Sequence, residues 1–290
     1  MSDLIILTDS SADLGEDMAR ELDVRVIPLG FVLDEHTYRD YPDSREMDPH
    51  TFYDLLRRGD TATTSAVNVA QYTEALEPLL QAGHDVLILA FSSGLSTTYN
   101  SSLIAVEELS AKYPDRKLYT VDTLCASLGQ GLLVWYAAKL RARGGSIDEI
   151  RDWVEEHKLN LCHQFTVDDL YFLKRGGRIS AATAIVGSML HIKPVLHVDD
   201  EGHLVSIGKA RGRQAALKAL VDRMEETAID PGSLTVFISH GDCLEDAQTV
   251  ADMVKKRFNV QDIYINYVGP VIGAHSGPGT VALFYMGTDR

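Results

Sequence analysis

The first 160 residues repeat one pattern, in which a short, mainly apolar run is followed by a polar turn and then by a helix. The apolar runs lie at residues 4–7, 24–32, 86–90 and 117–121. Runs of this length are typical of strands that are buried on both faces of a parallel sheet. The pattern therefore predicts an α/β fold with a doubly wound parallel sheet, in which ligands bind at the carboxyl ends of the strands.

Residues 161–290 have a different pattern, in which hairpins are mixed with helices. Two apolar runs, residues 192–198 and 204–208, flank a turn-forming Asp-Asp-Glu-Gly sequence and predict a hairpin. This mixture is typical of an α+β domain with a mixed sheet. We therefore expect two domains, residues 1–160 and 161–290, with a small surface excursion near residues 33–47 in the first.

The composition excludes several classes of partner. The chain carries 42 acidic and 27 basic residues, a net charge of −15, which argues against binding to nucleic acid or docking by charge on an anionic membrane. Its three cysteines are far apart and show no CxxC spacing, as is typical of a reduced compartment. The apolar run at the N-terminus is too short for a signal peptide, so we expect a cytoplasmic protein.

A turn rich in hydroxyl groups separates the apolar run at residues 86–90 from a helix predicted over residues 103–109. We call residues 91–102 the hydroxyl turn; five hydroxyl side chains lie between Ser92 and Thr98. The first turn of a helix has unpaired N–H groups and the positive end of the helix dipole, so it favours an anion. One hydroxyl would be enough for an N-cap. The excess predicts an anion site that includes Ser96 and Thr97, with helix capping alone as the alternative.

Two further segments could complete such a site. Residues 61–66 form a second hydroxyl cluster, with Thr64 and Ser65, and are expected to be a polar turn before a helix over residues 69–80. His275 lies in a predicted loop, residues 269–279, with four glycines and two prolines. Glycine allows the backbone to approach a ligand closely, and a histidine held there can bind a carboxylate or transfer a proton.

Other chemistries have weaker support. Asp9 follows the first apolar run, but Ser11 stands where a phosphatase would have a second acid, so we expect Asp9 to organise hydrogen bonds. His240 and Asp242 could suggest a metal, yet no third ligand has the expected spacing. We therefore expect no metal and no cofactor.

Several motifs together resemble those of the DegV family of bacterial fatty-acid-binding proteins. They run from end to end of the chain in family order, at residues 8–14, 64–65, 92–99, 121–122, 173–180, 192–194 and 273–279. The most specific are Leu-Lys-Arg-Gly-Gly-Arg-Ile-Ser, at residues 173–180, and the glycine-histidine segment at residues 273–279. Thr97 stands where the family often has glycine, and Ala66-Val67 stand where it often has Gln-Pro.

The resemblance implies a carrier that holds one long-chain fatty acid, such as palmitate or oleate, between its two domains. The carboxylate would be bound by Thr64, Ser65, Ser96, Thr97 and His275. The acyl chain would enter an apolar tunnel, and the uncharged segment at residues 179–190, predicted to be a helix buried on all sides, is a candidate wall. The candidate channel residues are Phe165, Ile179, Ile185, Val186, Met189 and Leu190.

The resemblance also implies a partner. In family members with a kinase partner, a separate ATP-binding fatty acid kinase converts the bound acid to an acyl phosphate, and the family pattern places Arg211 on the docking surface. The chain has no P-loop, so it would be the carrier and not the kinase. Arg211 lies at the start of a helix predicted over residues 211–226.

Two alternatives remain open at this point. The first is an enzyme, either a hydrolase or a carbonyl-substrate-binding protein, that uses Ser96 and His275, although the Gly-x-Ser-x-Gly pattern is absent. The second is a partner-binding scaffold whose polar turns only cap helices. A hydrolase needs an open cleft with room for water, a carrier needs a sealed apolar channel, and a scaffold needs no cavity.

Overall fold

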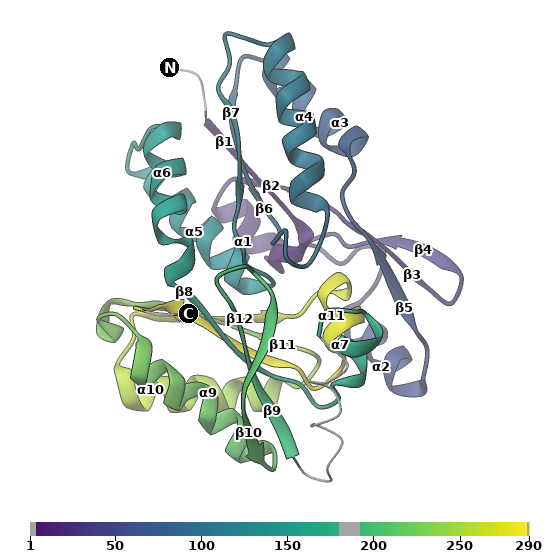
Figure 1. Cartoon of the computed structure of the whole chain (residues 1–290), viewed down its shortest axis with the longest axis vertical. Coiled ribbons are helices and arrows are strands. Elements are labelled where there is room, and N and C mark those ends of the chain that lie inside the picture. Colours follow the sequence, from purple (N-terminus) through teal and green to yellow (C-terminus); the bar gives the residue numbers. More distant parts are fainter. Residues whose placement is uncertain (1–3, 180–191, 289) are drawn as a thin grey trace.

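A computed structural model describes residues 4–179, 192–288 and 290 (Figure 1). A four-stranded parallel sheet lies in the N-terminal half, residues 4–160. Its strands, in spatial order, are β2 (Val24–Ile27), β1 (Leu4–Asp9), β6 (Asp85–Ala90) and β7 (Leu118–Asp122). The helices of this half are α1 (Glu16–Glu21), α2 (Pro49–Arg58), α3 (Val69–Gln81), α4 (Thr98–Lys112), α5 (Leu128–Ala142) and α6 (Ile147–His157).

Helices cover both faces of this sheet. Side chains alternate along β6, so Leu87 and Leu89 pack in the core that contains α5 and α6, whereas Val86 and Ile88 pack in the core that contains α3 and α4. Figure 1 shows the two pairs of helices on opposite sides of the strands. The predicted doubly wound parallel sheet is confirmed.

The C-terminal half, residues 161–179, 192–288 and 290, contains a six-stranded mixed sheet, as predicted. Its strands, in spatial order, are β10 (Leu204–Arg211), β9 (Ile192–Val198), β8 (Leu161–Thr166), β13 (Val281–Met286), β11 (Thr235–His240) and β12 (Asp262–Tyr267). Its helices are α7 (Tyr171–Arg175), α9 (Arg213–Thr227), α10 (Leu244–Phe258) and α11 (Pro270–Ser276). Among the described residues, the 3-10 turns are η1 (Ser10–Ala12), η2 (Lys158–Asn160) and η4 (Pro231–Ser233).

A small third sheet, in the order β4 (His36–Arg39), β3 (Gly30–Leu33) and β5 (Ala62–Ser65), lies beside the parallel sheet. The single strand expected over residues 24–32 is therefore wrong, because the chain leaves one sheet after β2 and enters another at β3. Pro28 has no N–H for a ladder. The N–H of Leu29 instead donates to the hydroxyl of Ser10, at 3.0 Å, and its carbonyl accepts from the N–H of Asp40, at 2.9 Å.

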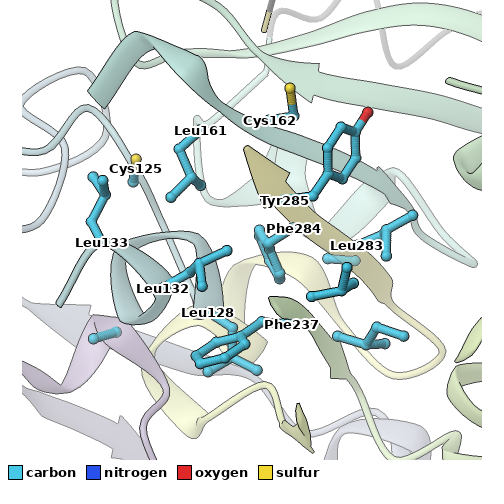
Figure 2. Close-up of a cluster of buried hydrophobic side chains, with 14 of the residues drawn as sticks. Cys125, Leu128, Leu132, Leu133, Leu161, Cys162, Phe237, Leu283, Phe284 and Tyr285 are labelled. Atoms are coloured by element: carbon cyan, nitrogen blue, oxygen red, sulfur yellow. The ribbon is translucent and has the colours of Figure 1, made fainter. Parts of the chain in front are cut away.

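Helix α5 packs between the two large sheets. It contacts β1 and β6 on one side and β8, β11 and β13 on the other. Figure 2 shows Leu128 and Leu132 of α5 grouped with Phe237 of β11 and Phe284 of β13, and all four are buried. Burying a side chain of this size is worth about 1.5–3 kcal/mol, so α5 contributes strongly to holding the halves together.

The strands of the two large sheets fall on either side of residue 160. We propose this point as the boundary between two domains, with α5 as their main contact. In the part of the chain that the structure describes, none of the helices is long and apolar enough to cross a membrane.

The close approach of α5 to β8 depends on a glycine. A Cβ atom added at Gly129 would lie 2.2 Å from Nε2 of His163, a buried ring that is held by hydrogen bonds to Ala126 and Leu161. We expect Gly129→Ala to lower the free energy of unfolding by about 1–3 kcal/mol, as overpacked cores do. Urea denaturation would measure this. Gly208→Ala is the control, since among the described residues its Cβ would meet Val195 alone, at an ordinary 3.7 Å. Equal stability of both variants would contradict the prediction.

Candidate functional site

A cavity of about 490 Å³ lies between the two halves. Its wall includes the hydroxyl turn and the end of β5 from the N-terminal half, and the sheet face and α11 from the C-terminal half. This volume is within the range of about 300–1,000 Å³ that is usual for small-molecule sites. Of the predicted carboxylate-binding residues, all five line it: Thr64, Ser65, Ser96, Thr97 and His275.

The buried side chain of Asp9 holds the start of the hydroxyl turn. The carboxylate of this fully buried residue accepts hydrogen bonds from the N–H of Phe91, at 3.0 Å, from the N–H of Ser11, at 3.0 Å, and from the amide of Gln130, at 3.2 Å. Burial raises the pKa of Asp9, while these hydrogen bonds lower it. The predicted role of Asp9 as an organiser of hydrogen bonds is confirmed.

Ser96 makes capping contacts and also lines the cavity. Its Oγ accepts a hydrogen bond from the N–H of Thr98, at 3.2 Å, and shares one with the hydroxyl of Thr98, at 2.9 Å. It thus caps the start of α4, whose N-cap residue is Thr97. Ser96 and Thr97 also line the cavity, beside the N-terminus of this 15-residue helix. The capping role therefore does not exclude an anion site.

Thr64 and Ser65 lie on a strand, and the polar turn predicted there is wrong. Strand β5 pairs with β3, as suits β-branched threonines, and α3 is instead capped by Asn68 together with Gln71. The hydroxyl of Thr98 accepts from the N–H of Val67, at 3.3 Å, which ties the hydroxyl turn to the end of β5.

His275 lies on the short helix α11, so the predicted loop is also wrong. Pro270 occupies the first turn, where its missing N–H costs nothing, and Gly277, at φ +79°, ends the helix. Nε2 of His275 is hydrogen-bonded to Oγ1 of Thr64, at 2.8 Å, which joins the two halves. Behind the ring is Gly176, where a Cβ would lie 2.2 Å from Nδ1.

The imidazole of His275 is neutral at pH 7. Burial, and then the positive charges of Arg178 and Arg175, lower its pKa to about 4. A neutral ring can still bind a carboxylate through one N–H.

Arg178 is a site residue that the sequence analysis did not identify. Its guanidinium lines the cavity and donates to the carbonyls of Leu95, at 3.2 Å, and Gly176. Burial lowers its pKa. Within residues 4–179, 192–288 and 290, no carboxylate forms an ion pair with it. Arg178 is therefore a cation available to an anionic ligand; the only sequence signal was its place in the basic glycine turn, residues 174–178.

Of the six residues predicted to line a channel, the structure describes two, Phe165 and Ile179. Phe165 lines the cavity from β8. Ile179 is buried in the main core but is outside the described cavity wall. The remaining candidates lie outside the described residues: Ile185, Val186, Met189 and Leu190.

Among the described residues, Asp242 and His240 do not belong to one cluster of possible metal ligands. Asp242 lies instead beside His50 and Asp54, with possible ligand atoms within 4.8 Å of one another. Asp242 is already paired with Arg57, at 2.5 Å, and His50, at 3.0 Å. These ion pairs satisfy its charge, and we assign no metal to the cluster.

Comparisons with known proteins agree with the fold and the motifs. A family model described as "Uncharacterised protein, DegV family" matches residues 3–288. A DegV domain-containing protein of Clostridium perfringens is 50% identical over 290 residues, covering 100% of this chain and 99% of the relative. A DegV lipid-binding protein of Thermotoga maritima has a similar structure, with a TM-score of 0.88, 30% identity and 100% coverage of both chains. A DegV family protein of Thermus thermophilus, described by its fatty acid binding, has a TM-score of 0.88 and 30% identity, covering 98% of this chain and 99% of its own.

The charge state of His275 can be tested by NMR titration. We expect its ring resonances to titrate with a midpoint near pH 4, far below the usual 6.5. Arg178→Met should raise this midpoint, because removing a nearby positive charge makes the imidazolium easier to form. Arg25→Met, which changes an exposed arginine of β2, should leave it unchanged. A midpoint near 6.5 in the unmodified protein would contradict the described environment.

Proposed function

Because the chain belongs to the DegV family, we propose that it binds one long-chain fatty acid in the cavity between its two halves. The carboxylate would be held by Thr64, Ser65, Ser96, Thr97 and His275, with Arg178 as its counter-ion. The acyl chain would lie along the apolar wall.

The observation that carries this proposal is the division of the cavity wall into polar and apolar parts. The polar part is a connected set, since Thr64 is bonded to His275 and Arg178 is bonded to the backbone of Leu95, next to Ser96. Much of the remaining wall is apolar: Leu29, Phe165, Leu173, Val198, Leu204, Val268, Val271, Ala282 and Phe284. A molecule with one anionic end and a long apolar tail matches both parts.

The two parts contribute differently to binding. Burying a methylene group is worth about 0.8 kcal/mol, so a tail of about 14 methylenes gives roughly 11 kcal/mol before the costs of ordering and association. Each hydrogen bond to the carboxylate adds only about 1 kcal/mol after desolvation. The tail therefore supplies most of the affinity, and the polar groups select a carboxylate and fix its place.

We further propose that the protein is a carrier that presents its ligand to a separate fatty acid kinase. The chain has no P-loop of its own. Arg211, the proposed docking residue, is exposed at the end of the edge strand β10 and not at a helix start, because α9 begins at Arg213. In the described part of the chain no carboxylate pairs with Arg211, so its charge is free to meet an acidic partner.

Ligand binding can be tested by native mass spectrometry of the purified protein. We expect one bound fatty acid per chain, and Ser96→Ala and His275→Ala should each weaken binding of added palmitate by about 5–10-fold, the value of one hydrogen bond. Ser101→Ala, elsewhere on α4, is the control and should bind normally. A protein that co-purifies without lipid and takes up neither palmitate nor oleate would refute the proposal.

Docking can be tested separately from binding. Arg211→Glu should leave palmitate affinity unchanged but reduce acyl phosphate formation, measured by hydroxylamine trapping with ATP and the fatty acid kinase of the same organism. The reason is that a reversed charge repels an acidic docking surface. Arg143→Glu, an exposed site on the N-terminal half, serves as the control. Wild-type acyl phosphate formation by Arg211→Glu would contradict the docking role.

A further inference from the structure

The helix that carries His275 is held at its beginning by side chains from the N-terminal half. The hydroxyl of Tyr53 donates to the carbonyl of Val268, at 2.7 Å, just before α11. The N–H of Gly269 donates to Oδ1 of Asp13, at 3.0 Å, and the N–H of Val271 donates to Oδ2 of Asp40, at 3.4 Å. The start of α11 is thus fixed by groups that are more than 200 residues away in the sequence.

The buried carboxyl groups of Asp13 and Asp40 both approach Gly269, just before the first turn of α11. A Cβ added at Gly269 would lie 2.9 Å from Oδ1 of Asp13 and 3.0 Å from Oδ2 of Asp40. The side chains are only 6% and 8% exposed, respectively. Asp13 is also bonded to the hydroxyl of Ser127, at 2.5 Å, a residue of the cavity wall. Only a glycine leaves room for both acids beside the backbone.

We propose that Asp13 and Asp40 are positioning residues for the ligand's carboxylate: they set the place of His275 by holding the first turn of α11, and ionisation of Asp40 weakens ligand binding. The binding part of this inference rests on the proposed function, because it requires His275 to contact the ligand. The positioning part concerns the protein alone.

The surroundings of Asp40 make its charge sensitive to pH near neutrality. Burial raises the pKa of Asp40 to about 7, against the lowering effect of the Val271 N–H and Ser10, and Asp9 raises it further. Burial also raises the pKa of Asp13 well above its usual value, with Asp40 and Asp9 adding to the effect. In the part of the chain that the structure describes, Tyr53 also interacts with both acids and Tyr264 with Asp13, and neither tyrosine supplies a positive charge.

The surroundings of Asp40 also determine in which direction ligand affinity changes with pH. Below pH 7 Asp40 is protonated and neutral, and above pH 7 it is a buried anion. Val271, which it holds, lines the cavity, so this anion lies just behind the wall and opposes the ligand's carboxylate. Affinity should therefore fall as pH rises through 7, by about fivefold between pH 6 and 8, the size of a weak coupling between two sites.

The first experiment compares palmitate affinity at pH 6, 7 and 8 in wild type and in Asp40→Asn. At pH 6 the variant should bind within twofold of wild type, because its amide oxygen still accepts from Val271. The affinity of the variant should not fall at pH 8. Titration of palmitate itself affects both proteins equally, so it cancels in the ratio of their affinities. Asp252→Asn, an exposed acid of α10, is the control. The same pH profile in wild type and Asp40→Asn would overturn the binding part.

The second experiment needs neither ligand nor a variant of Asp13 or Asp40. In ligand-free wild type, the ring resonance of His275 should show an inflection near pH 7, assigned by its loss in His275→Ala. Its own protonation lies near pH 4, so a shift near 7 reports the ionisation of Asp40. A flat resonance from pH 6 to 8 would overturn the positioning role. Wild type that binds no palmitate, yet shows the inflection, would refute the proposed function and leave the positioning role standing.

Discussion

The packing of helix α5 against both large sheets determines where the cavity of this protein lies. The helix contacts the parallel sheet on one side and the mixed sheet on the other, and two glycines allow the close approach. A Cβ at Gly129 would meet His163 of the mixed sheet, and one at Gly131 would lie 2.6 Å from the carbonyl of Ala12 beside the parallel sheet. The cavity lies beside the start of α5, where Ala126 and Ser127 line it together with Phe91, which follows β6.

Local groups, and not the overall charge, make this space suitable for an anion. The chain carries a net charge of −15, and the buried acids Asp9, Asp13 and Asp40 lie beneath the cavity wall. Burial raises the pKa of each of these acids, which reduces the negative charge near the cavity. Arg178 and the N-terminus of α4 then supply the positive potential at the polar end of the site.

The sequence predicted the sheets better than it predicted the site. Continuous apolar runs such as residues 86–90 identify buried strands because their signal is local. Thr64 was placed on a turn, since a short edge strand and a polar turn have similar compositions. Arg178 was missed because its partner, the carbonyl of Leu95, is 83 residues away. Asp13 belongs to the motif at residues 8–14, but that motif does not indicate its neighbour Asp40, because the two acids come together only in the fold, beside Gly269.

The contacts of Ser96 and His275 favour holding a carboxylate over hydrolysing an ester. In the described residues Ser96 is bonded to Thr98, and Nε2 of His275 is bonded to Thr64, so the pair does not form a nucleophile and its base. A general base works best when its pKa lies near the working pH, whereas burial and two arginines lower the pKa of His275 to about 4. The same features suit a carrier, since a neutral imidazole can donate a hydrogen bond to a carboxylate without abstracting protons from its surroundings.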